Sequence, residues 1–321
     1  MTSKTGSLQP DLSVVVVVLT GRKDCISRCL SALTQQRDAP ATEIIVPCDE
    51  SIGDLPALKD EFPEVAFLSV EGKRTYAELR TIGVRASRGA IVALTEDHCT
   101  VAPDWSAQIL FAHQAPHAAI GGAVEKTGRD TSLNWALYLA DYLRYMNPLQ
   151  EGPAVNLTDC NVTYKRPSLD AIEDTWTDEF HEPVVHAALQ AQGSSLWLDP
   201  KIVVYQQRSV DLKAALRDRY AFGRLFASTR AAEFSRTQRL RYSLLSLALP
   251  AVLVGRVAAH VLRKRRCAAE FVRSLPYLML VSTVWAGGEF LGYVTGRAEG
   301  SLTAEVREAD KLVQRGREVI L

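Results

Sequence analysis

The stretch AIVALTEDHCTVAPDW, residues 90–105, decides the fold of this chain of 321 residues. It starts as an apolar β-run over Ile91–Leu94, stops at Glu96-Asp97-His98, and enters a helical pattern at Pro103-Asp104-Trp105. Open α/β sheets bind ligands outside the carboxyl ends of their strands. Two carboxylates and an imidazole at such an end suit Mn²⁺ or Mg²⁺, which bridge a diphosphate and neutralise charge on a leaving group. The same residues also fit a solvated acidic turn that caps the next helix.

Strands and helices alternate on the N-terminal side of this stretch. Buried β-runs at Leu12–Leu19, Glu43–Val46 and Val65–Val70 are separated by helical patterns, the clearest of them over Tyr76–Ala86. This alternation predicts an α/β fold with a mostly parallel, Rossmann-like central sheet flanked by helices. The sequence contains neither GxGxxG after the first strand nor GxxxxGK[ST], which argues against a dinucleotide-binding dehydrogenase and a P-loop NTPase.

Further elements are expected beyond residue 118. They are strands at Ile120–Val124 and Asn161–Tyr164, an aromatic helix at Asn134–Tyr145, a helix at Phe180–Gln192, and two short strands within Trp197–Tyr205 that Asp199-Pro200 separates. An aromatic stripe on a helix is more often core than a platform for a sugar.

Cysteine usage and charge indicate the compartment and the partners. Six cysteines occur without a CxxC pair, which favours a reduced, cytosolic protein that buries them as small apolar side chains. The run at Val14–Leu19 is too short for a signal peptide, so we expect the catalytic part to stay in the cytoplasm. The net charge of zero conceals a basic segment over Arg208–Arg266, which favours an anionic partner. Its basic residues alternate with aliphatic ones rather than with aromatic stacking platforms, which favours lipid over nucleic acid.

The motifs over Leu12–Arg230 together resemble family 2 glycosyltransferases, inverting enzymes of the GT-A fold that use nucleotide-diphosphate sugars. Glu96-Asp97-His98 with Pro103-Asp104-Trp105 is similar to the family's Asp-x-Asp metal motif and the Pro-x-Pro-Asp-Trp that follows it. The resemblance implies Mn²⁺ or Mg²⁺ held by Asp97 with His98 or Glu96. A histidine in place of the last carboxylate makes that ligand neutral and pH-sensitive and weakens the affinity for a hard cation.

The same resemblance implies a set of donor contacts from four strand ends and one helix. Thr20 holds the place of the family's Pro-Thr-Tyr-like turn, and Asp49, in Cys48-Asp49-Glu50-Ser51, is the candidate for the nucleobase contact. Arg80 lies in a segment that looks like the family's Ala-Arg-Asn-x-Gly helix, although an arginine on a helix face also serves structure. The expected donor-binding residues are Thr20, Asp49, Arg80, Glu96, Asp97 and Asn161, the last from a segment similar to the family's Gly-x-Asn-x-Ala-x-Arg-Arg.

The family carries its catalytic base on an acidic pair at the start of a later helix, and here His181-Glu182-Pro183 takes that place. Because an acceptor hydroxyl is deprotonated by a carboxylate or an imidazole within reach, Glu182 is the expected base, with His181 or His186 in reserve. A helix N-terminal carboxylate beside Pro183 is the structural alternative. The segment Gln206-Gln207-Arg208-Ser209 lacks the tryptophan of processive synthases, so we expect transfer of a single sugar.

We expect a catalytic domain over residues 1–210 and a membrane-associating helical region over residues 211–321. Asp211–Arg230 has a basic amphipathic pattern that suits an anionic membrane surface. Apolar stretches follow at Tyr242–Leu262 and Leu275–Val294, each long enough to span a bilayer. Because basic residues flank both ends of the first stretch, a re-entrant or in-plane helix pair is favoured over a two-span hairpin. Helices buried against a partner subunit, and thus a homo-oligomer, are the alternative, and the charged segment from Ser301 fits a solvated tail or a pairing helix.

The sequence therefore predicts an enzyme at the cytoplasmic face of the cell membrane. It would move one sugar from a nucleotide-diphosphate sugar to a hydroxyl of a lipid or lipid-linked acceptor, with inversion and with a divalent ion. Departures from the family pattern at Cys48, His98, Pro183 and Gln206 keep a second interpretation, a catalytically silent membrane-associated scaffold or nucleotide-binding protein. A nucleic-acid binder is the third and least favoured.

Overall fold

The computed structural model describes residues 9–50, 52–126, 128, 130–231 and 234–296. The described residues form two compact units. We call the described residues within 1–125 and 149–207 the sheet unit, and those within 126–148 and 208–296 the helical unit. The chain passes from the sheet unit to the helical unit between residues 207 and 208, close to the domain boundary expected after residue 210. Residues 126–148 belong to the helical unit, although the sequence analysis included them in the catalytic domain.

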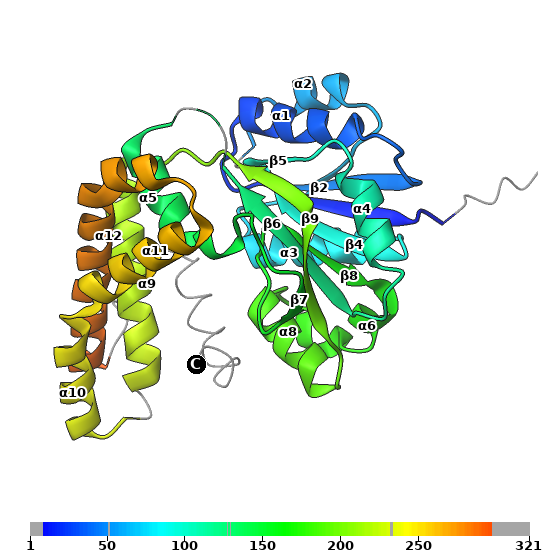
Figure 1. Ribbon diagram of the computed structural model, residues 1–321. Coiled ribbons are helices and arrows are strands. Elements are labelled where there is room, and N and C mark those ends of the chain that lie inside the picture. Colours follow the sequence, from blue (N-terminus) through cyan, green and yellow to red (C-terminus); the bar gives the residue numbers. More distant parts are fainter. Residues whose placement is uncertain (1–8, 51, 127, 129, 232–233, 297–321) are drawn as a thin grey trace, which may run out of the picture. The chain divides into compact units, whose positions relative to one another are not determined.

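A single nine-stranded sheet forms the centre of the sheet unit (Figure 1). Its strands follow the order β3-β2-β1-β4-β8-β6-β9-β5, and β7 pairs with β9. The strands are β1 (Leu12–Val17), β2 (Thr42–Cys48), β3 (Ala66–Ser69), β4 (Ile91–Glu96), β5 (Cys99–Val101), β6 (Ala119–Glu125), β7 (Gly152–Ala154), β8 (Val162–Lys165) and β9 (Leu196–Gln206). The helices of this unit are α1 (Lys23–Thr34), α2 (Leu55–Glu61), α3 (Tyr76–Ala86), α4 (Trp105–Ala112), α6 (Arg166–Asp170), α7 (Glu173–Trp176) and α8 (Glu182–Ala191).

The sheet is mixed, with the expected parallel arrangement in its first half and one further parallel pair, β6 with β9. Strands β3, β2, β1 and β4 are parallel, whereas β8 runs antiparallel to both β4 and β6, and β5 and β7 run antiparallel to β9. The connection after β4 also differs from a crossover helix: a two-residue turn at Asp97-His98 leads directly into β5, which pairs with β9 and not with β4. The predicted pair of strands within 197–205 is one strand, β9, whose register against β6 shifts between Gly122 and Ala123. Asp199-Pro200 therefore marks a bulge.

Helices cover both faces of the sheet, which explains why β1 is apolar throughout. All six of its residues are buried, and successive side chains point to opposite faces. Val15 and Val17 pack in one core with α3 and α8. In Figure 1, α1 and α2 lie on one side of the sheet and α3, α6 and α8 on the other. All six cysteines are free and five are buried, as their spacing indicated.

The helical unit is a bundle around α12. Its elements are α5 (Ser132–Asp141), the 3-10 turn η1 (Leu143–Tyr145), α9 (Leu212–Ala231), α10 (Arg236–Ser246), α11 (Leu249–Lys264) and α12 (Ala268–Thr295). The expected aromatic helix is divided into α5 and η1, and its Trp135 and Tyr138 are buried as core residues. Glycines let α12 approach α9 closely, since a Cβ at Gly288 would lie 2.3 Å from the backbone oxygen of Tyr220.

The first apolar stretch, over residues 242–262, is divided between α10 and α11. Among the described residues, no single helix is both long and apolar enough to cross a membrane. Helices α10 and α11 together pass that test, but they are bent by 55° where they meet. The charged segment expected from Ser301 lies outside the described residues.

Candidate functional site

Polar residues from five strands meet at one edge of the sheet, although the sheet is mixed. The parallel strands β1, β2 and β4 end there, next to Thr20, Asp49 and Glu96-Asp97-His98. Strand β8 runs the other way, so its beginning, next to Asn161, lies at the same edge. Strand β9 is parallel to β6 and ends there with Gln206. The reversal of β8 therefore brings the 160 region to the edge where the sequence placed the donor site.

Asp97 holds the turn that follows β1. One carboxylate oxygen, Oδ1, accepts a hydrogen bond from the Leu19 N–H at 3.1 Å, and Oδ2 accepts from the Thr20 N–H at 3.0 Å and from the Thr20 hydroxyl. Burial acts to raise the pKa of Asp97, but the contacts with His98, Thr20 and Leu19 outweigh it and keep the pKa below its usual value. Thr20 and Asp97, both predicted to bind the sugar donor, are thus hydrogen-bonded to each other.

His98 is buried between the carboxylates of Glu96 and Asp97. Only 3% of the residue is exposed, and neither ring nitrogen makes a hydrogen bond. Nε2 lies 3.3 Å from Glu96 Oε2, and Nδ1 lies 3.7 Å from Asp97 Oδ1. Because buried ring nitrogens are ordinarily satisfied, this imidazole between two carboxylates fits a cation.

Arg80 connects the strand edge to the start of α8. Its Nη2 donates to Glu96 Oε1 at 3.1 Å, and its Nη1 donates to Glu182 Oε2 at 3.0 Å. The guanidinium lies 4.8 Å from the ring centre of Tyr76. Burial disfavours its charge, but Glu182 and Glu96 outweigh that effect and raise the pKa of Arg80. The arginine therefore stays charged and binds two carboxylates that the sequence assigned to different roles.

Glu182 is almost completely buried, with 5% of the residue exposed. Burial is the main cause that raises its pKa to about 8, and the charges of Asp159 and Glu96 act in the same direction, while Arg80 opposes them. A carboxylate with such a pKa is a stronger base near neutral pH than an exposed glutamate.

Asp159 is the residue at this site that the sequence reasoning missed. It interacts electrostatically with both Arg80 and Glu182, and it is only half-buried. The sequence does place Asp159 immediately before Cys160-Asn161, in the segment similar to the family's Gly-x-Asn-x-Ala-x-Arg-Arg, and this position could have identified it as a site residue.

The two reserve histidines are placed differently. His181 caps α8, with its Nε2 3.4 Å from Glu179 Oε2 and its ring edge-on to Tyr76. His186 is buried, its Nε2 is 3.0 Å from the Tyr164 hydroxyl, and burial lowers its pKa to about 3. His186 is therefore a neutral core residue and not a reserve base.

Asn161 and Asp49 form hydrogen bonds with other segments of the sheet unit. The Asn161 amide donates to the carbonyls of Ala123 and Ile202, both at 2.9 Å, and its oxygen accepts from Trp105 Nε1 at 3.0 Å. Both amide hydrogens are used, so Asn161 connects three segments of the fold, and its contact with the donor stays a prediction. Asp49 accepts a hydrogen bond from the Arg74 N–H at 2.9 Å and is 8% exposed.

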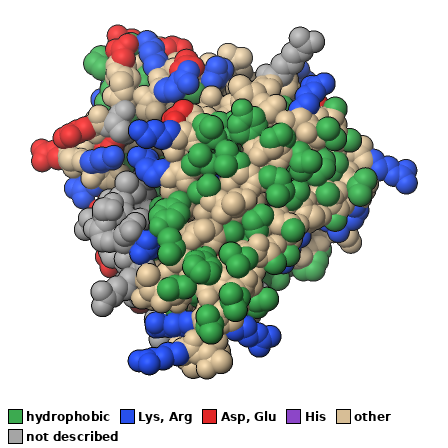
Figure 2. Space-filling model, turned by 90° about the vertical axis from the view of Figure 1, so that its left-hand side faces the viewer, with side chains coloured by type: hydrophobic (Ala, Val, Ile, Leu, Met, Phe, Trp, Pro, Cys, Tyr) green, Lys and Arg blue, Asp and Glu red, His purple; other side chains and the backbone are tan. Residues whose placement is uncertain are grey.

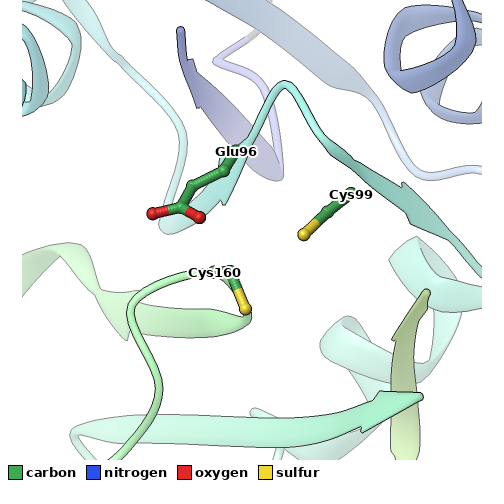
Figure 3. A group of neighbouring side chains, drawn as sticks. All are labelled: Glu96, Cys99 and Cys160. Carbon is green, nitrogen blue, oxygen red and sulfur yellow. The ribbon is translucent and has the colours of Figure 1, made fainter. Parts of the chain in front are cut away.

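Glu96, Cys99 and Cys160 form a second group with metal-binding atoms close together (Figure 3). One ligand atom of each lies within 4.8 Å of the others, and all three residues are buried. A hydrogen bond to Cys160 and burial raise the pKa of Cys99 well above its usual value, so the thiol keeps its proton. A cation here would have to remove thiol protons and compete with Arg80 for Glu96, so we interpret the two cysteines as buried core side chains.

The family model described as Glycosyl transferase family 2 matches residues 13–173 of the chain. The match includes every strand-end residue from Thr20 to Asn161 and ends before Glu182. Among solved structures, the chain is similar to the mannosyltransferase PcManGT from Pyrobaculum calidifontis in complex with GDP-Man and Mn²⁺, with 16% identity, a TM-score of 0.49, and coverage of 86% of this chain and 87% of that one. No curated protein matches.

Proposed function

The chain belongs to glycosyl transferase family 2, and we propose that it moves a single sugar from a nucleotide-diphosphate sugar to an acceptor hydroxyl with inversion. The observation that supports this most is the arrangement at the strand edge. There the buried His98 lies between two carboxylates, and Arg80 joins the same edge to Glu182. The site thus combines a place for a cation and a carboxylate of raised pKa.

His98 would be the principal ligand of Mn²⁺ or Mg²⁺, with Asp97 and Glu96 on either side. When bound, such an ion offsets the negative charge that develops on a departing diphosphate. Asp97, whose oxygens already accept hydrogen bonds from the β1 turn, contributes mainly by orienting that turn and its imidazole neighbour.

Glu182 would act as the base that takes the proton of the acceptor hydroxyl. Arg80 holds the carboxylate in place through two of its nitrogens, at 3.0 Å and 2.8 Å from the two Glu182 oxygens. The raised pKa supports the role, because a base works best when its pKa is near the working pH.

The acceptor would be a lipid or lipid-linked molecule at the cytoplasmic face of the cell membrane. The support is the helical unit, in which apolar helices carry a basic excess. The second candidate, a silent scaffold, is favoured by the departures from the family motifs and by the use of Asn161 for structure.

Calorimetric titration with a panel of nucleotide diphosphates, with and without Mn²⁺, tests the proposal. We expect binding that requires the ion and is lost in His98→Ala. His117→Ala is a matched control, since His117 bonds Ser195 near the start of β9, at the opposite edge of the sheet. Donor hydrolysis separates enzyme from scaffold, because a scaffold binds without turnover. Binding that is indifferent to Mn²⁺ and to His98 would overturn the assignment.

A further inference from the structure

Large apolar side chains are exposed on three successive helices of the helical unit, α10, α11 and α12. They include Leu244, Leu247 at the C-terminal cap of α10, Leu262, Val272, Met279 and Val294. Figure 2 shows hydrophobic side chains over a broad field of this face, with Lys and Arg mostly at its edges. Monomeric soluble proteins seldom expose a contiguous apolar field of more than a few hundred Å². The face is therefore built to contact something apolar.

The charge of these helices identifies an anionic partner. Residues 236–296 contain nine Lys and Arg against two acids, Glu270 and Glu289, a net charge of +7. Glu289 is buried within the unit, where its carboxylate accepts a 2.6 Å hydrogen bond from Trp285 Nε1. The exposed charge around the apolar field is thus almost entirely positive, which complements anionic lipid headgroups.

The geometry favours a position along the membrane surface rather than across the bilayer. The bend of 55° between α10 and α11 prevents a straight crossing. Arg256 and Arg263 are exposed on α11, and a crossing would carry such charges into hydrocarbon. When the helix lies in the interface, their side chains extend to the headgroups. The opposite side of α12 is used to pack on α9 through Gly288 and Gly292.

We propose that the face of α10, α11 and α12 that carries these six side chains lies in the boundary between headgroups and acyl chains of an anionic bilayer, with the helices in the plane of the membrane. Such an anchor leaves the bilayer uncrossed. The inference rests on the proposed lipid-linked acceptor for its biological purpose, but its test involves neither donor nor acceptor.

Vesicle flotation of the purified full-length protein tests this surface. We compare vesicles of phosphatidylcholine alone with vesicles that also contain phosphatidylglycerol. We expect flotation with the anionic vesicles that high salt weakens. In the variant L244E/L247E we expect partitioning to fall by about tenfold or more for each leucine, because each loses its transfer into an apolar phase. Release by alkaline carbonate is expected for an in-plane helix, whereas retention would indicate a crossing and overturn the in-plane orientation.

The matched control is F111E/V155E, which places the same charges on the sheet unit. Phe111 and Val155 are 62% and 66% exposed, close to the 57% and 66% of Leu244 and Leu247. This control should float like the wild type, and both variants should keep the wild-type circular dichroism.

If the wild type fails to float with any vesicle, or if both variants lose flotation equally, the proposal is wrong. If the wild type is a dimer in solution without vesicles, and L244E/L247E is a monomer, the face belongs to a contact with a second copy of the chain instead. Failure of the wild type to float, with its donor hydrolysis intact, would refute the membrane surface and leave sugar transfer standing.

Discussion

Arg80 Nη1 donates a 3.0 Å hydrogen bond to Glu182 Oε2, which joins two residues 102 positions apart in the sequence. Through the same guanidinium, α8 is connected to Glu96 at the end of β4. The candidate base and the candidate donor strand therefore share one buried cation. A change at Arg80 acts on both sides of the site at once.

Replacement of Arg80 by alanine should destabilise the sheet unit strongly. It leaves Glu96 and Glu182 buried without their cation, and removal of one partner from a buried pair costs about 3–5 kcal/mol. Urea denaturation followed by tryptophan fluorescence measures the loss. Arg74→Ala is the control, since the ion pair of Arg74 with Glu78 is partly exposed and should contribute less than about 1 kcal/mol. Equal effects of the two substitutions would contradict a structural role for the Arg80 network.

The rate of sugar transfer should rise with pH up to about 8. The Glu182 carboxylate accepts a proton only when it is ionised, and burial raises its pKa to about 8. In Glu182→Gln this limb of the pH profile should disappear, with a rate loss of about 10²–10⁴-fold. In Asp159→Asn the limb should remain but move to lower pH, because the charge of Asp159 helps to raise the pKa of Glu182. If Asp159→Asn abolishes the limb and Glu182→Gln retains it, Asp159 is the base.

The same shift predicts how stability changes with pH. The folded protein binds the Glu182 proton more tightly than the unfolded chain, in which a glutamate has its ordinary pKa of about 4.5. This contribution to the free energy of unfolding is fully present below pH 4.5 and is lost as the pH rises to about 8. Relative to Glu182→Gln, the wild type should therefore lose stability across that interval. Denaturation of both proteins at several pH values measures their difference in stability. A wild type that gains stability relative to Glu182→Gln as the pH rises would show a lowered pKa instead.

Two adjacent glycines in α12 should respond in opposite ways to alanine. A Cβ at Gly288 would lie 2.3 Å from the Tyr220 oxygen and 2.8 Å from the Arg224 nitrogen, both backbone atoms of α9. The required helix displacement should cost about 1–3 kcal/mol. Gly287 has nothing within 4 Å of that position, so alanine should stabilise the helix by about 0.5–1 kcal/mol. Thermal unfolding of the two variants checks the contrast, which close packing of α9 on α12 requires.

The sequence by itself determined the alternating α/β pattern and the edge at which polar residues collect. β-branched runs that are apolar on both faces specify strands covered by helices, and residues such as Thr20, Asp49 and Glu96 follow those strands directly. The 3.6-residue period likewise located α3, whose bounds at Tyr76–Ala86 agree with the prediction. These features depend on neighbours in sequence, so periodicity is sufficient to find them.

Only the tertiary structure decided which polar residues serve the fold. Asn161 and His186 have the residue types of a site, but their partners come from segments 22 to 56 positions away and consume their hydrogen-bonding groups. The same folding brings Arg80 onto Glu182 and leaves the His98 ring without a hydrogen bond. The antiparallel direction of β8, which makes the sheet mixed, could not be predicted from the periodicity of the sequence either. Strand direction depends on the path that the chain takes between strands. Hydrogen bonds and ion pairs between distant residues leave no periodic signal, and they set the chemistry of this site.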